Sequence, residues 1–173
     1  MFGVGLGRGD ELIAPSRTYW VSALQVFSLG ATVVFADVHP VSLCLDPNGI
    51  ERHITPHTRA IMVVHYHAYP ADMDPIMEIA RRHNLKVIED VSHAHGTLYK
   101  GRMVGVIGDV SAMSLMSQKS LAAGEGGMLC TNDQRIYERA IAFGHYERHG
   151  DSITLPDLKA LAGLPLGGVK HRM

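Results

Sequence analysis

The chain has 173 residues, of which 46% are hydrophobic and 19% are charged, and its formal net charge at pH 7 is −1. This length and composition are typical of one soluble globular domain, and the small net charge gives no electrostatic reason to expect nucleic acid or an anionic membrane as a partner. Cys44 and Cys130 lie in apolar contexts without metal-type spacing, and no apolar run reaches the length of a membrane span. We therefore expect a cytoplasmic protein with reduced cysteines.

The first half of the chain alternates between strand-like and helix-like patterns. We expect strands at Glu11–Ala14, Thr32–Ala36 and Ala60–Val64, and a helix over Arg17–Leu29 that ends at Gly30. Runs such as 61-IMVV-64 are too continuously apolar for a half-exposed strand, so they favour a parallel sheet that is covered on both faces.

The second half continues this alternation. A helix follows Pro70, with Asp74 as its cap and Pro75 in its first turn. Strands are expected at Lys86–Glu89, Asp109–Ser114 and Gly127–Cys130, and a last helix at Asp133–Tyr146, capped by Asn132 or Asp133. The whole pattern predicts an α/β fold of three layers, α, β and α, around a mostly parallel sheet.

Candidate chemical groups follow the predicted strands, at the sheet edge where open parallel sheets bind ligands. Asp90 comes directly after 86-KVIE-89, and Lys119 lies in 114-SLMSQKSLAAGEGG-127. Pyridoxal 5′-phosphate needs a lysine amine to hold its aldehyde as a Schiff base and an acidic group to keep its ring nitrogen protonated. Ser114, Ser117 and the glycine turn at 124–127 suit its phosphate. The pattern therefore predicts a pyridoxal phosphate site without metal, in which Lys119 is catalytic.

The paired histidines leave a second interpretation open. His65 and His67 form one His-x-His pair, and His93 and His95 form another. On strands, each pair would point two imidazoles to one face, so a zinc or iron site is a rival to the cofactor site. No carboxylate or cysteine spacing completes such a site, and it would leave the lysine segment unexplained.

Four segments together resemble the sugar aminotransferases of the DegT/DnrJ/StrS family: 10-DELIAPSRTYWVSA-23, 29-LGATVVFADV-38, 70-PADMDPIMEIARRHNLKVIEDVSHAHGTLYKGR-102 and 117-SQKSLAAGEGGMLCTND-133. The resemblance implies the large domain of the fold-type I pyridoxal phosphate transferases, the aspartate aminotransferase-like fold, truncated at both ends. Residues 1–150 would form the cofactor-binding domain without its first phosphate-binding segment. Residues 151–173 would form a loop that leads to an absent C-terminal small domain.

The resemblance also implies roles for single residues. Lys119 falls at the Schiff-base lysine, and Asp90 at the carboxylate that pairs with the pyridine nitrogen. His93 falls near the ring and its 3-hydroxyl, Ser114 at a phosphate-binding serine, and Tyr19 at the aromatic residue that stacks on the ring.

Lys170 stands where the family usually has an asparagine that reaches the phosphate in the partner subunit, and a lysine can contact phosphate as a point charge. The resemblance implies a homodimeric aminotransferase that moves an amino group from glutamate or glutamine to a keto sugar, nucleotide-linked, or to a related cyclic ketone. A non-catalytic member of the fold that binds the cofactor, or an inactive fragment, is the alternative.

Overall fold

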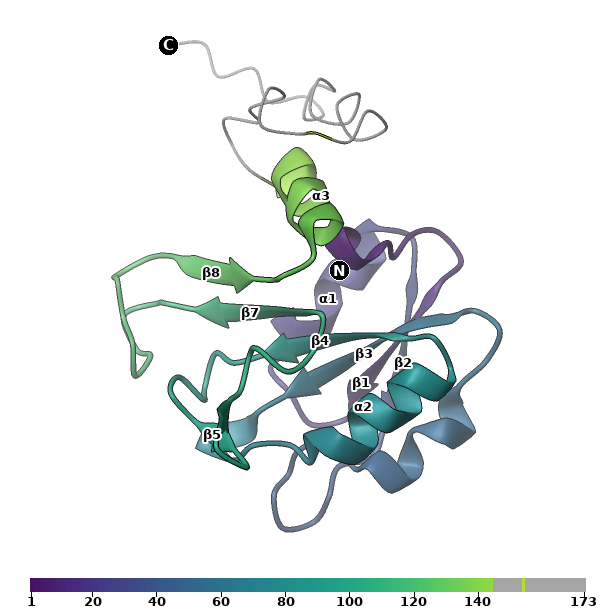
Figure 1. The fold of residues 1–173 in the computed structure, drawn as a ribbon, viewed down its shortest axis with the longest axis horizontal. Helices are drawn as coiled ribbons and strands as arrows, with labels where there is room; N and C mark the ends of the chain where they lie inside the picture. Colours follow the sequence, from purple (N-terminus) through teal and green to yellow (C-terminus); the bar gives the residue numbers. More distant parts are fainter. Residues whose placement is uncertain (145–153, 155–173) are drawn as a thin grey trace.

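A six-stranded sheet forms the middle layer of the computed structural model, which describes residues 1–144 and 154 (Figure 1). The strand order is β2-β1-β3-β4-β7-β8, and only β8 runs antiparallel to its neighbour. The strands are β1 (Glu11–Pro15), β2 (Thr32–Ala36), β3 (Thr58–Val64), β4 (Lys86–Asp90), β7 (Val110–Ser114) and β8 (Gly127–Cys130). A separate antiparallel pair consists of β5 (Leu98–Tyr99) and β6 (Arg102–Met103). The predicted mostly parallel sheet is confirmed.

Helices cover both faces of this sheet. In Figure 1, α2 (Met73–Arg82) lies in front of the sheet and α1 (Val21–Ser28) lies behind it. The third helix, α3 (Gln134–Gly144), contacts the short 3-10 helix η1 (Phe2–Val4) near the N-terminus. Three further 3-10 helices are η2 (Pro47–Gly49), η3 (Glu51–His53) and η4 (Tyr66–Ala68). The expected three layers are therefore present.

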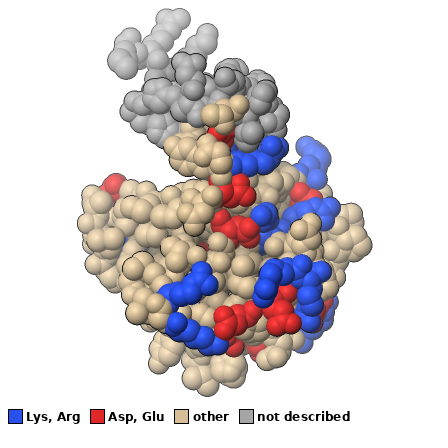
Figure 2. Space-filling model, viewed as in Figure 1, with Lys and Arg blue, Asp and Glu red and all other residues tan. Residues whose placement is uncertain are grey.

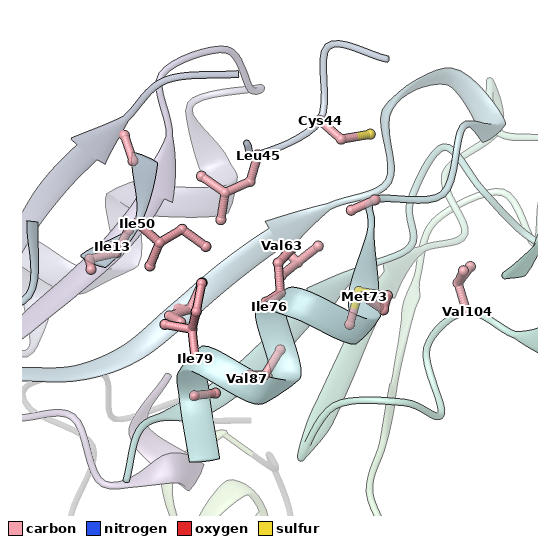
Figure 3. Packing of buried hydrophobic residues seen from close by; sticks show 14 of the residues in the cluster. Ile13, Cys44, Leu45, Ile50, Val63, Met73, Ile76, Ile79, Val87 and Val104 are labelled. Carbon is pink, nitrogen blue, oxygen red and sulfur yellow. The ribbon is translucent and has the colours of Figure 1, made fainter. Parts of the chain in front are cut away.

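The side chains of successive strand residues pack into two different hydrophobic cores, one on each face of the sheet. This explains the continuously apolar runs in the sequence. Ile13 and Val63 pack with Ile76 of α2 in one cluster of buried side chains (Figure 3). Their neighbours Leu12 and Met62 point to the opposite face and pack with α1 and η1. Because side chains alternate along a strand, a strand that is buried on both faces must be apolar at almost every position.

The first predicted helix begins later than expected. The sequence pattern places its start at Arg17, but α1 begins at Val21. The Ser16 N–H donates to the Ala36 carbonyl at 2.8 Å, so the chain continues its pairing with β2 past the end of β1. This ladder bond keeps residues 16–20 out of a helix, and it leaves Tyr19 in a turn at the sheet edge.

The predicted caps are right for one helix and wrong for another. Asp133 caps α3, because its Oδ1 accepts from the N–H groups of Arg135 and Ile136 at 2.8 and 3.2 Å. Asp74 does not cap α2: the N-cap residue is Asp72, and Asp74 lies in the first turn with its N–H bonded to the Tyr99 hydroxyl. The tertiary contact with Tyr99 therefore decides where this helix begins.

The described surface carries charges of both signs. Figure 2 shows acidic and basic side chains mixed over the face that carries α2, while the area over β7 and β8 is mostly uncharged. Among the described residues, none of the helices combines the length and the apolar character that crossing a bilayer requires. The predicted boundary after residue 150, the segment 151–173 and Lys170 lie outside the described residues, apart from residue 154.

We expect Ile76→Ala to lower the free energy of unfolding by about 2–5 kcal/mol, because it removes a fully buried side chain of α2 and leaves a cavity against the sheet. Urea unfolding followed by circular dichroism measures the change. Glu78→Ala on the exposed side of the same helix is the control and should change stability far less. Equal effects of the two substitutions would contradict the packing of α2 described above.

Candidate functional site

Asp90 is the last residue of β4, and its carboxylate is held in a fixed orientation. Its Oδ2 accepts from the Ser22 hydroxyl at 2.7 Å, and its Oδ1 accepts from the Ser92 N–H at 3.0 Å. The Thr18 hydroxyl donates in turn to the Ser22 hydroxyl at 3.0 Å. These bonds fasten the turn before α1 to the carboxyl end of β4.

Ser114 ends the neighbouring strand β7 and is tied to the same edge. Its N–H donates to the Ser92 hydroxyl at 2.9 Å, and its carbonyl accepts from His95 Nε2 at 3.1 Å. Its hydroxyl oxygen accepts from the Met116 N–H at 3.3 Å, and the Met116 carbonyl accepts from the Lys119 N–H at 2.9 Å. A short series of turns thus carries the chain from the end of β7 to Lys119.

Lys119 and His93 influence each other electrostatically. Partial burial lowers the pKa of His93, and the positive charges of Lys119 and His67 lower it further, while Asp90 opposes them. The rings of His67 and His93 lie 5.3 Å apart, centroid to centroid. Asp90 and Lys119, which the sequence predicts as site residues, are thus both near enough to His93 for their charges to act on it, and their shared role in a site stays a prediction.

Tyr19 lies in the turn before α1, and its ring is exposed rather than packed over other residues of the predicted site. Its side chain is 62% exposed, and its ring centroid lies 5.2 Å from that of Trp20. Its carbonyl accepts from the Ser22 N–H at 3.0 Å, which places it one turn from the bond between Ser22 and Asp90. Stacking of Tyr19 on a cofactor stays a prediction, and Lys170 lies outside the described residues.

A cavity of about 620 Å³ opens beside Asp90, between α1, β4, β7 and η1. Ser22, Asp90, Ser92 and Ser114 supply its polar groups. The apolar part of its wall includes Val21, Leu29, Met62, Ile88, Met113 and Met128. A carboxylate, serine hydroxyls and an apolar wall fit a flat heteroaromatic ring with a protonated nitrogen and a phosphate. The groups present here therefore fit the ring and phosphate of pyridoxal phosphate, while Lys119 and His93 are not among the residues that line this cavity.

A buried hydrogen-bonded pair, the Glu89 carboxylate and the His65 imidazole, lies behind Asp90 and was missed by the sequence analysis. Glu89 and His65 are both fully buried, and His65 Nε2 lies 3.0 Å from Glu89 Oε2. Because His65 Nδ1 accepts from the Ala71 N–H at 3.1 Å, the hydrogen is on Nε2, which donates to Glu89. A carboxylate inside an otherwise apolar strand was the available signal, since a buried charge needs partners.

Three backbone N–H groups also donate hydrogen bonds to the Glu89 carboxylate. Gly105 donates to Oε2 at 2.7 Å, and Ile107 and Gly108 donate to Oε1 at 2.8 and 2.6 Å. A Cβ at position 108 would lie 2.8 Å from the Val87 carbonyl oxygen, so only glycine allows this close approach. Burial opposes ionisation of Glu89, but the bonds from His65 and the three N–H groups outweigh it and lower its pKa.

The described residues do not form a metal site from the two His-x-His pairs. Both pairs follow strands rather than lying on them: His65 and His67 lie after β3, with His67 in η4, and His93 and His95 lie after β4, so the alternation of a strand does not apply to them. His65 is committed to Glu89 and Ala71, while His67 points to the surface. Within residues 1–144 and 154, no group of three His, Cys, Asp or Glu side chains is arranged to hold a metal ion.

The fold, with its mostly parallel six-stranded sheet, matches the large domain of pyridoxal phosphate aminotransferases over part of their length. The chain belongs to the DegT/DnrJ/EryC1/StrS aminotransferase family, whose model matches residues 1–161. Members of this family bind pyridoxal phosphate or its amino form, pyridoxamine phosphate.

The most similar proteins include enzymes that aminate sugars and cyclitols. The chain is 48% identical to GDP-perosamine synthase of Caulobacter vibrioides, over 77% of the chain and 36% of the relative. It is 46% identical to L-glutamine:scyllo-inosose aminotransferase of Streptomyces griseus, over 79% of the chain and 32% of the relative. The crystal structure of NtdA from Bacillus subtilis with bound PMP matches with a TM-score of 0.78 at 28% identity, over 94% and 39% of the two chains. The chain thus spans about a third of the length of these relatives.

We expect Glu89→Gln to lower the free energy of unfolding at neutral pH by about 1–3 kcal/mol, because an amide cannot accept from all of the N–H groups that surround the carboxylate and leaves a buried donor without an acceptor. Since the native pKa of Glu89 is lowered, its stabilisation is present above the ordinary value of 4.5 and is lost as the pH falls through the native pKa. Urea unfolding between pH 3 and pH 7 measures both effects. The exposed substitution Glu78→Gln is the matched control, and a Glu89→Gln chain with wild-type stability and pH dependence would refute this account.

We expect Lys119→Ala to raise the pKa of His93 toward its ordinary value of 6.5, because one neighbouring positive charge is removed. An NMR titration of the histidine ring signals, with His93 assigned by His93→Gln, measures the shift. Lys100→Ala removes a lysine that is paired with Asp74 away from this site and should leave the His93 titration unchanged. If Lys119→Ala also leaves it unchanged, Lys119 does not lie near His93.

Proposed function

We propose that this chain is most of the cofactor-binding domain of a pyridoxal phosphate aminotransferase. It would move an amino group from glutamate or glutamine to a keto sugar, nucleotide-linked, or to a related cyclic ketone. The observation that carries the proposal is the oriented carboxylate of Asp90 on the same sheet edge as Lys119. The names of two relatives, a GDP-perosamine synthase and a glutamine-dependent aminotransferase of scyllo-inosose, support the substrate class.

The cofactor, when bound, supplies an electron sink for the carbon that loses a proton. Asp90 would hold the proton on the ring nitrogen of the cofactor, and the bonds from Ser22 and Ser92 orient its carboxylate in the cavity. Lys119 would hold the cofactor covalently through Nζ until the amino donor displaces it. The freed amine of Lys119 then takes the proton from the α-carbon of the donor and returns a proton one step later.

The other predicted residues would complete the binding of the cofactor. His93 lies at the level of Asp90 and Lys119, where its ring nitrogen can bond the 3-hydroxyl group. The hydroxyl hydrogen of Ser114 is free to donate to phosphate, because in this structure its oxygen acts as an acceptor. Tyr19 would move over the ring from its exposed position. Lys170 would contact the phosphate held by the partner subunit of a homodimer.

We expect the purified chain to form an adduct on Lys119 when pyridoxal phosphate is added and reduced with borohydride. An absorption band near the visible edge should be lost on reduction, and mass spectrometry should find the pyridoxyl group on the peptide that contains Lys119. Lys119→Arg keeps the charge but cannot form the bond, so its peptide should stay unmodified, whereas Lys100→Arg should behave as wild type.

Absence of the adduct from a folded wild-type chain would refute the cofactor proposal. An adduct on Lys119 without amino transfer to any keto sugar would instead identify a non-catalytic protein that binds the cofactor. Circular dichroism on the same samples establishes that each variant is folded.

A further inference from the structure

The guanidinium group of Arg17 is held by Tyr66 at the rim of the proposed site. Arg17 lies in the turn between β1 and α1, and its Nη2 donates to the Tyr66 hydroxyl at 3.3 Å. Its Cζ lies 5.3 Å from the centroid of the Tyr66 ring. Tyr66, which follows β3, thus orients the guanidinium group of Arg17 through its hydroxyl and its ring. Arg17 is exposed, and no carboxylate in residues 1–144 forms a salt bridge with it.

A row of basic groups connects Arg17 to the proposed catalytic lysine. Tyr66 contacts His67 edge to face with ring centroids 4.5 Å apart, and His67 lies 5.3 Å from His93. The charge of Lys119 acts on His93 in turn. Asp90 is the acidic group that also acts on His93, and both of its oxygens already accept hydrogen bonds. Arg17 and Lys119 thus place two basic side chains at the ends of a row formed by the rings of Tyr66, His67 and His93.

The backbone that presents His67 is strained. His67 and Ala68 are successive non-glycine residues with φ of 48° and 64°, a conformation that costs about 1–3 kcal/mol at each position. The Ala68 N–H donates to the His93 carbonyl at 2.9 Å, which holds the strained loop against the segment after β4. Strain of this kind is concentrated at binding sites, and here it places the imidazole of His67 between Tyr66 and His93.

We propose that Arg17, oriented by Tyr66 and flanked by His67, binds the anionic group of a substrate at the rim of the site. The ligand chemistry is a carboxylate or a phosphate, because a guanidinium fork bonds the paired oxygens of either group. The inference rests on the proposed function, whose amino donor carries a carboxylate and whose nucleotide-linked acceptor carries phosphates. Arg17 is exposed and does not line the cavity beside Asp90, so it would hold the substrate rather than the cofactor.

The test measures anion binding at His67 and needs neither cofactor nor turnover. The ring signals of the whole chain, with His67 assigned by His67→Gln, are followed by NMR during titrations with inorganic phosphate and with L-glutamate. Sodium chloride keeps the ionic strength constant. Wild type should show a saturable shift of the His67 signal with at least one anion. Arg17→Met should weaken that binding about tenfold or more, since a hydrogen-bonded charge pair is lost, and Arg17→Lys should lie between them.

Arg81→Met is the matched control, because it removes an exposed arginine of α2 that bonds only the carbonyl of its own helix at Met77. It should bind like wild type. A response to glutamate alone identifies the carboxylate of the donor, a response to phosphate alone identifies the acceptor, and a response to both identifies a general anion site. No saturable shift in wild type, or equal binding by wild type and Arg17→Met, would overturn the inference. The proposed function fails separately, through the absence of an adduct on Lys119.

Discussion

The buried carboxylate of Glu89 is the constraint on which the carboxyl edge of the sheet depends. A charge with no exposed surface is tolerated only when every oxygen has donors, and here His65, Gly105, Ile107 and Gly108 supply them. The loop after β3 and the loop before β7 must therefore converge on β4. Because side chains alternate along a strand, fixing Glu89 on one face points Asp90 to the opposite face, toward α1.

That orientation divides the edge into two environments. On the side of α1, Asp90 meets hydroxyl groups and an apolar wall, an arrangement suited to a flat ring that must keep a proton on its nitrogen. On the side of η4, the rim carries Arg17, His67 and His93. The charge of Lys119 acts on His93, on this second side. A reaction that joins a cofactor to an anionic substrate needs both environments next to one lysine.

Much of the fold could be predicted, because burial on both faces leaves a clear pattern in the sequence. Each predicted sheet strand begins and ends within two residues of the observed one, as for Ala60–Val64 in β3. The errors occur where a single distant contact overrides local preference. The Ser16 N–H bonds Ala36 and delays α1, and Tyr99 bonds the Asp74 N–H and moves the cap of α2. The histidine pairs fail for a related reason, since a loop after a strand does not preserve the alternation of the strand.

The sequence by itself determined the order of strands and helices along the chain and the positions of Asp90 and Ser114 at strand ends, with Lys119 shortly after one, because these follow from local hydrophobic periodicity. Only the tertiary structure decided which side chains meet across that edge. His65 and Glu89 are 24 positions apart, Arg17 and Tyr66 are 49 apart, and Ser22 and Asp90 are 68 apart. Such contacts depend on strand order and on the direction of each side chain, which are set by how the helices pack on the sheet rather than by any local pattern of residues.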